Sequence, residues 1–308
     1  MGVGGFRTGG RPAPAGKRLV AALLTALLAG CGPATAATGG PAPARVAPTG
    51  TYAVGVRTFT VDARSVRPLP VTVWYPTRAG AVADGRFPLV VYSHGLHSLP
   101  ELHAGLTTRW AAAGFVVVAP AYPHTRRGAP RFDRADVRHQ PADAWRVVRH
   151  LLRLDSRGGD PLAGHLDLTR IAAAGHSAGG FTTAGMFTTG HSARLRAGIV
   201  LAGGGMAGSF AGQTAPVLFV HGTHDRIVPM TVGRAAYDRT TGPAAFLSVL
   251  GQGHGEYLIP GRPGFDPVLT TTTDFLRWTL YDDPAAGRRL PADATSPGVT
   301  AYEDRLAP

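Results

Sequence analysis

The sequence places a serine between two glycines where a predicted strand gives way to a predicted helix. Residues 175–179 are Gly-His-Ser-Ala-Gly, after the apolar run 171–174 and before a small-residue helix predicted to follow. A serine in such a strand–turn–helix bend is exposed as a nucleophile, and a side chain on Gly175 or Gly179 would collide with the neighbouring turn. Ser177 is the predicted nucleophile, and a glycine-rich loop without chemistry is the alternative.

A nucleophilic serine needs a base, and the base needs an acid to orient it. Asp225 follows the strand predicted over residues 215–220, and His254 lies in a glycine-flanked loop after the strand predicted over residues 245–250. The order serine, acid, histidine is the one found with this type of bend. We therefore predict Asp225 as the orienting acid and His254 as the base.

Two other histidines lie closer to Asp225 in the sequence. His221 ends the preceding strand, where its ring could satisfy loop backbone, and His224 could face solvent. Each remains an alternative base. Asp225 could also cap the helix predicted to begin near Pro229, because aspartate is a favoured residue at helix N-termini.

Acyl transfer also needs hydrogen-bond donors directed at the developing oxyanion. The N–H of Ala178, directly after the serine, is one predicted donor. Gly95 lets the chain turn sharply after the strand predicted over residues 87–92, and the N–H of Leu96 is the second predicted donor. The side chain of Leu96 would then border the acyl pocket, and a His-Gly turn with no catalytic part is the alternative.

The segments around these residues alternate between strands and helices. Residues 52–60 and 69–75 alternate in polarity and predict an antiparallel pair, whereas the continuous apolar runs 87–92 and 115–119 predict strands buried on both faces. Helices are predicted over residues 102–113, 142–154, 178–187 and 267–280, and further strands over residues 171–174, 195–201, 215–220 and 245–250. This order predicts an α/β fold with a mostly parallel central sheet and helices on both faces. Residues 202–214 are small and few, so no lid domain is predicted.

The N-terminus predicts a lipoprotein signal peptide over residues 1–30. Basic residues precede the apolar stretch 19–28, which is too short to span a bilayer and suits a signal peptide. Residues 28–31 are Leu-Ala-Gly-Cys, which resembles the bacterial lipobox, and Cys31 is the only cysteine. We expect a lipid on Cys31 and an exported, membrane-anchored protein of the bacterial cell envelope, with an ordinary secretory peptide as the alternative.

The remaining chain is predicted to form a tether and one domain. Residues 31–50 are rich in Pro, Ala and Gly and predict a flexible tether with a reach of about 25 Å. The domain is predicted over residues 51–308.

The composition fits a globular chain and argues against nucleic-acid binding. Hydrophobic residues make up 44% of the chain, and 31 Lys and Arg against 19 Asp and Glu give a net charge of +12. The arginines are scattered, whereas a nucleic-acid binder more often has a clustered basic stripe. The dispersed histidines show no metal-ligand spacing, and no nucleotide-binding motif follows a strand, so neither a metal nor a cofactor is predicted.

Residues 88–96, 114–119 and 175–180 resemble the α/β-hydrolases related to platelet-activating-factor acetylhydrolase, bacterial cutinase-type polyester hydrolases and dienelactone hydrolases. The resemblance covers about residues 52–280. It implies the α/β-hydrolase fold and a small-molecule carboxylic ester as substrate.

Three departures separate the chain from the named enzymes. Residues 202–206 hold no carboxylate, unlike the acetylhydrolases, and the position of Asp225 is closer to the dienelactone-hydrolase and cutinase arrangement. Leu96 stands where polyester hydrolases usually present an aromatic residue, and one cysteine cannot form their C-terminal disulfide. Dienelactone hydrolases typically have a cysteine where Ser177 stands.

These observations predict a serine esterase that forms an acyl-enzyme, with a preference for short acyl groups. The first alternative is a serine peptidase or amidase with the same three residues. The second is a non-catalytic, surface-anchored binding protein on the same scaffold.

Overall fold

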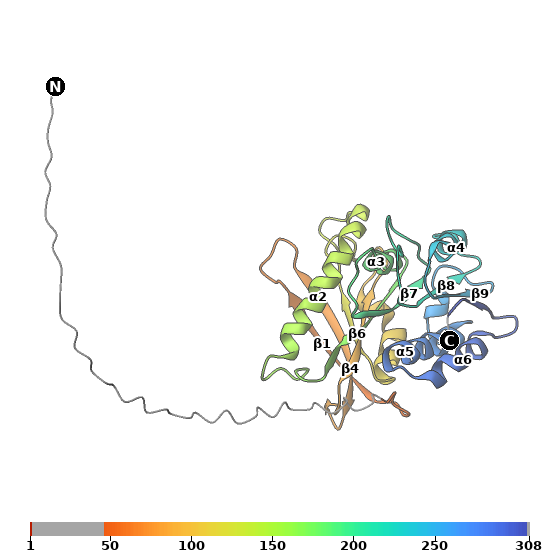
Figure 1. The fold of residues 1–308 in the computed structure, drawn as a ribbon, viewed down its shortest axis with the longest axis horizontal. Helices are drawn as coiled ribbons and strands as arrows, with labels where there is room; N and C mark the ends of the chain where they lie inside the picture. Colours follow the sequence, from red (N-terminus) through yellow and green to blue (C-terminus); the bar gives the residue numbers. More distant parts are fainter. Residues whose placement is uncertain (2–45, 307–308) are drawn as a thin grey trace, which may run out of the picture. The chain divides into compact units, whose positions relative to one another are not determined.

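A ten-stranded sheet lies at the centre of the part of the chain that the computed structural model describes, which is Met1 and residues 46–306 (Figure 1). The strands are β1 (Ala53–Val61), β2 (Leu69–Arg78), β3 (Ala81–Val82), β4 (Phe87–Ser93), β5 (Val116–Pro120), β6 (Leu166–His176), β7 (Leu195–Leu201), β8 (Val217–Gly222), β9 (Ala244–Val249) and β10 (Thr300–Asp304). The helices are α1 (Ala104–Ala112), α2 (Gln140–Asp155), α3 (Ala178–Met186), α4 (Met230–Arg239), α5 (Phe265–Tyr281) and α6 (Pro284–Ala294). Short 3₁₀ helices are η1 (Pro100–His103), η2 (Arg134–His139) and η3 (Glu256–Leu258).

The strand order brings the predicted site residues to one edge of the sheet. The order is β1-β2-β5-β4-β6-β7-β8-β9-β10, with β3 paired to β2. Strands β5, β4, β6, β7, β8 and β9 are parallel, whereas β1, β2 and β10 are antiparallel to their neighbours. Parallel strands end at the same edge, so the loops after β4, β6, β8 and β9 lie together there. Those loops carry Leu96, Ser177, Asp225 and His254.

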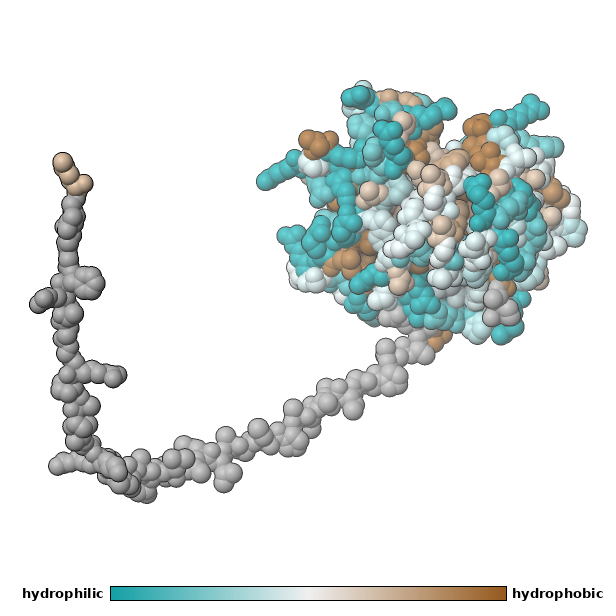
Figure 2. Space-filling view, turned by 45° about the horizontal axis from the view of Figure 1, so that its top comes forward, coloured by the Kyte–Doolittle hydropathy of each residue, from teal (hydrophilic) through white to brown (hydrophobic). Residues whose placement is uncertain are grey.

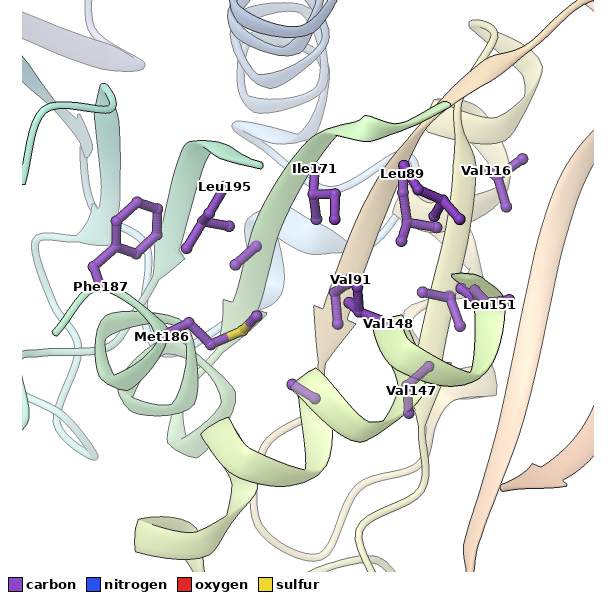
Figure 3. Packing of buried hydrophobic residues seen from close by; sticks show 14 of the residues in the cluster. Leu89, Val91, Val116, Val147, Val148, Leu151, Ile171, Met186, Phe187 and Leu195 are labelled. Carbon is purple, nitrogen blue, oxygen red and sulfur yellow. The ribbon is translucent and has the colours of Figure 1, made fainter. Parts of the chain in front are cut away.

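Helices cover both faces of the sheet because its central strands are apolar on both sides. In β4, Leu89 and Val91 belong to the hydrophobic cluster that includes α2, α3 and α4. The alternate residues of β4 belong to the cluster that includes α1, α5 and α6. Figure 3 shows Val147 and Leu151 of α2 beside the strands on the first of these faces.

The predicted fold class is confirmed, and most predicted elements are present within a few residues of their expected ends. The strand predicted over residues 171–174 is too short, because β6 begins at Leu166 and its first half includes the polar residues Asp167 and Arg170. Helix α6 and strands β3 and β10 are missing from the predicted elements. Pro291 interrupts the helical pattern of α6, and β10 is an edge strand with mostly exposed residues.

The predicted signal peptide, Cys31 and most of the tether lie outside the described residues. No helix in the described part of the chain is both long and apolar enough to cross a membrane. Figure 2 shows hydrophilic side chains over much of one face, with smaller hydrophobic areas between them. Isolated exposed hydrophobic residues of this kind are normal on a protein surface.

A partly buried ion-pair network fastens the β1–β2 loop to the start of α2. Arg67 in that loop donates to Asp136 of η2 at 2.8 and 2.7 Å, and its Nε donates to Asp143 of α2 at 2.8 Å. The two carboxylates are only 6% and 3% exposed. Removal of the Arg67 guanidinium would leave the buried carboxylate of Asp136 without its arginine partner and Asp143 with Arg146 alone, at 3.0 Å.

We therefore predict that Arg67→Met lowers the free energy of unfolding by about 3–5 kcal/mol, the usual effect of breaking a buried ion pair. The matched control is Arg196→Met, because Arg196 and its partner Asp282 are 39% and 53% exposed. The control should lose about 0–1 kcal/mol, as exposed pairs do. Urea denaturation measures both variants, and equal losses would contradict the assignment.

Candidate active site

Ser177 lies at a sharp bend between β6 and α3. Its backbone has φ 57° and ψ −121°, a conformation that non-glycine residues rarely adopt. A Cβ at Gly175 would lie 2.2 Å from the carbonyl oxygen of Gly179, and one at Gly179 would lie 1.9 Å from that of Ser93. The bend therefore depends on glycine at both positions, since backbone occupies the space that a side chain would need.

Asp225 and His254 meet at the same edge of the sheet. His254 Nδ1 lies 2.7 Å from Asp225 Oδ2, while Asp225 Oδ1 accepts hydrogen bonds of 2.9 Å from the N–H groups of Ile227 and Val228. Burial favours the neutral acid, but the hydrogen bonds from His254, Val228 and Ile227 outweigh it and hold the pKa of Asp225 below its ordinary value. Asp225 is thus an ionised carboxylate with one oxygen directed to His254.

His221 is a second histidine in contact with Asp225. Its Nε2 lies 2.8 Å from the carbonyl oxygen of Val228 and 3.3 Å from Asp225 Oδ2, and its side chain is 1% exposed. Burial lowers the pKa of His221, although the Val228 carbonyl and the Asp225 carboxylate oppose the shift. The bond to a carbonyl makes Nε2 the protonated nitrogen, so His221 is a donor to the loop that carries Asp225.

Two further alternatives from the sequence are His224 as the base and Asp225 as the cap of α4. His224 is exposed. The residue that caps α4 is Pro229, without a side-chain cap, so Asp225 does not cap that helix. Asp225 instead closes a local turn through its bonds to Ile227 and Val228.

The loop that carries His254 is held by hydrogen bonds both on the side of Ser177 and on the side of Asp225. Toward the serine, His176 Nε2 donates to the carbonyl oxygen of His254 at 2.5 Å, and the two rings lie 4.8 Å apart. Toward the acid, the N–H of His224 donates to the carbonyl oxygen of Gln252 at 2.9 Å. A Cβ at Gly222 would lie 2.2 Å from the Gly253 oxygen. The structural roles of His176 and Gly222 are missing from the sequence-based predictions, although both lie in the predicted motifs.

Within residues 46–306, Ser177 Oγ makes no direct hydrogen bond to another protein group. The bond between a catalytic serine and its base is often long in a site without substrate and tightens when substrate binds.

The two predicted oxyanion donors belong to the residue after Ser177 and to the loop that packs against Ser177. A Cβ at Gly95 would lie 3.1 Å from Ser177 Cβ, so the loop that continues into Leu96 touches the serine. Ala178 is the first residue of α3, where an N–H has no acceptor within the helix. The N–H of Leu96 donates to no protein acceptor in the described part of the chain. Neither N–H group is thus occupied by a protein acceptor in the described residues.

The segment after β5 borders the loop of Leu96. Residues 202–216 after β7 form no helix. In the segment after β5, the ring of Phe132 stacks on that of His97, with centroids 3.8 Å apart and an interplanar angle of 11°. Phe132 is 39% exposed, so this stacked pair forms an accessible aromatic wall next to Leu96.

No group of three or more His, Cys, Asp and Glu side chains in the described residues could hold a metal ion. Several histidines near the site are instead wholly or partly buried. Burial lowers the pKa of His94 to about 4, against the effect of its bond to the Gly95 carbonyl. Burial lowers the pKa of His176 to about 4 as well, and that of His103 well below its ordinary value.

The parallel sheet, the glycine-flanked bend at Ser177 and the paired His254 and Asp225 define an α/β-hydrolase. The chain belongs to the PET hydrolase-like family, whose model matches residues 32–254. A search of curated proteins gave no match. The protein is accordingly an ester-hydrolysing α/β-hydrolase.

Acid should weaken the fold through the buried neutral histidines. His94 is fully buried with a pKa of about 4, whereas an unfolded histidine has a pKa of about 6.5. Between these values the unfolded chain binds the extra proton, so stability falls as the pH is lowered through this window. On acidification from pH 7 to 5, His94→Gln should lose about 1–2 kcal/mol less unfolding free energy than the wild type. Urea denaturation at both pH values measures this difference, and parallel losses in the two proteins would contradict it.

Proposed function

We propose that the protein is a serine carboxylic-ester hydrolase in which Ser177 is the nucleophile, His254 the base and Asp225 the orienting acid. The observation that carries the proposal is the 2.7 Å hydrogen bond between His254 Nδ1 and Asp225 Oδ2 at the edge that presents Ser177. That bond places the Nδ1 proton toward the acid and leaves Nε2 of a neutral imidazole as the basic nitrogen.

In the first step, His254 Nε2 takes the proton of Ser177 Oγ as the oxygen attacks the ester carbonyl carbon. The N–H groups of Leu96 and Ala178 hold the resulting oxyanion. Asp225 remains ionised and stabilises the imidazolium. His254 then returns the proton to the leaving alcohol, and the acyl group stays on Ser177. In the second step, water gives a proton to His254 Nε2 and attacks the acyl carbon. The bond from that carbon to Ser177 Oγ then breaks, His254 returns the proton to Ser177 Oγ, and the carboxylic acid product leaves.

The proposed substrates are esters with short acyl groups. The segment between β7 and β8 contains no helix to act as a lid, and Ile227 beside Asp225 is 72% exposed. Each buried methylene is worth about 0.8 kcal/mol, so a long chain that stays in water gains little over a short one. The matching family is described as PET hydrolase-like. PET, an aromatic polyester, is therefore a second substrate to test.

Ser177→Ala should abolish ester hydrolysis and labelling by a fluorophosphonate probe. Loss of a triad member commonly lowers kcat by several orders of magnitude, so His254→Ala should be nearly as inactive and Asp225→Ala less severely affected. Gel fluorescence and initial rates with p-nitrophenyl butyrate measure these effects.

His224→Ala is the matched control, because His224 lies in the same region but is exposed. It should keep wild-type activity. Probe labelling that survives in Ser177→Ala, or a dead His224→Ala beside an active His254→Ala, would refute the assignment.

The preference for acyl length can be measured as kcat/KM over p-nitrophenyl esters from acetate to palmitate. We expect the maximum at about C2 to C6 and no rate jump at the micellar concentration, because an acyl chain that stays in water gains no methylene burial free energy. A chelator should not change the rates. A maximum at palmitate would show that a tunnel or lid forms around the substrate.

We also propose that the protein is exported and anchored to a membrane through a lipid on Cys31. Its support is the lipobox-like sequence at residues 28–31. In a bacterial host the wild type should fractionate with membranes and incorporate labelled fatty acid, because two or three acyl chains give stable anchoring. Cys31→Ser should do neither. Soluble, unlabelled wild-type protein would exclude the anchor.

A further inference from the structure

Three buried polar side chains connect the helix that follows Ser177 with the segment after β5. Thr182 of α3, Gln140 at the start of α2 and Thr125 after β5 are each 0% exposed. Thr182 Oγ1 lies 2.5 Å from Gln140 Oε1, and Gln140 Nε2 donates to Thr125 Oγ1 at 2.7 Å. Gln140 therefore uses both ends of its amide to join two elements that are far apart in the sequence.

One end of this chain of hydrogen bonds reaches Ala178, the residue whose N–H is the first predicted oxyanion donor. Thr182 Oγ1 lies 3.1 Å from the carbonyl oxygen of Ala178 as well as close to Gln140. The hydroxyl is thus positioned against the first turn of α3, where the N–H of Ala178 has no helical acceptor.

The other end supports the loop that carries the second donor. The N–H of His97, the residue after Leu96, donates to the Thr125 carbonyl oxygen at 2.8 Å. The N–H of Arg127 donates to the carbonyl oxygen of Ser98 at 2.8 Å. His97 also has a φ of 53°, an uncommon conformation for a residue other than glycine that neighbouring contacts must maintain. The position of Leu96 is therefore set by the segment that Gln140 anchors.

Burial of the Gln140 amide carries a desolvation free energy that packing alone does not require. An apolar side chain could fill the same space without the desolvation of the amide oxygen and nitrogen, and a buried polar network is favourable only when its members have partners. Here each end of the Gln140 amide has a hydrogen-bond partner, and each partner lies on an element that leads to the site. The network also lies where α2 and α3 pack closely together. A Cβ at Gly185 of α3 would lie only 2.5 Å from Pro141 Cγ of α2.

We propose that Gln140 is a positioning residue that sets the spacing between the N–H groups of Ala178 and Leu96. This inference rests on the proposed esterase mechanism, in which those two groups hold the oxyanion. Gln140 does not touch the substrate. It acts through Thr182 on one side and Thr125 on the other.

The test uses the full chain with Gln140→Met, which keeps the length of the side chain and removes the amide, and with Thr125→Val. Displacement of one donor should lower kcat for p-nitrophenyl butyrate about 10–100-fold, less than the complete loss of a donor, with a much smaller change in KM. The affinity for a boronic acid, whose tetrahedral adduct places an oxygen in the same position, should fall in parallel. Thr125→Ser keeps the hydroxyl and should retain near wild-type kcat.

The matched control is Thr271→Val, which removes a fully buried hydroxyl that bonds only the Pro267 carbonyl within α5. It should lower the melting temperature without lowering kcat. An equal loss of kcat in Thr271→Val would reduce the effect to general destabilisation and overturn the proposal. So would kcat within about twofold of wild type in both Gln140→Met and Thr125→Val, since a displaced donor must act on the transition state.

Hydrogen exchange separates this proposal from the esterase mechanism. The backbone amides of residues 95–98 should exchange faster in Gln140→Met and Thr125→Val than in the wild type. Their exchange rates should be unchanged in Thr271→Val. An inactive wild type with this exchange pattern would refute the esterase function and leave the positioning contact intact. Active wild type with unchanged exchange in both variants would refute the positioning role alone. If Gln140→Met fails to fold, Thr125→Val carries both measurements.

Discussion

Backbone contact between the end of β4 and the start of α3 is the constraint on which the site depends. A Cβ at Gly179 would lie 1.9 Å from the carbonyl oxygen of Ser93, so the two segments touch with no side chain between them. The chain at Ser177 must turn within this space, and it does so with a φ of 57°. Such a conformation persists only where the surroundings fix it, here through the sheet on one side and α3 on the other. The same contact brings the Gly95 loop against the serine.

A second backbone contact has the same effect for the base. Gly222 at the end of β8 lies against the Gly253 carbonyl, which fixes the His254 loop beside the loop of Asp225. The carboxylate then joins several groups at once, because it accepts from two backbone N–H groups and from His254. Charge-assisted bonds of this kind are stronger than neutral ones and favour a single geometry. The proposed serine, acid and base are thus held by main-chain packing first and by side-chain hydrogen bonds second.

The sequence predicts the parts of this arrangement that are encoded locally. Continuous apolar runs identify β4 and β5, and the glycine spacing around Ser177 identifies the bend, because each is a property of neighbouring residues. Contacts between distant residues have no such signal. The partner of His176 is 78 positions away, and those of Gln140 are 15 and 42 positions away. The contact of His221 with Asp225 has the spacing of neighbours on a helix, yet it forms between a strand end and a loop. Only the folded chain reveals it.

The central claim is that ester cleavage passes through an acyl group on Ser177. The most direct measurement is acid quenching of the enzyme during turnover of p-nitrophenyl butyrate, followed by peptide mass spectrometry. The account predicts a butyryl group on Ser177 in the quenched wild-type enzyme. A butyryl group on another residue, or none on Ser177 at an early time when one equivalent of nitrophenol has been released in a burst, would contradict it.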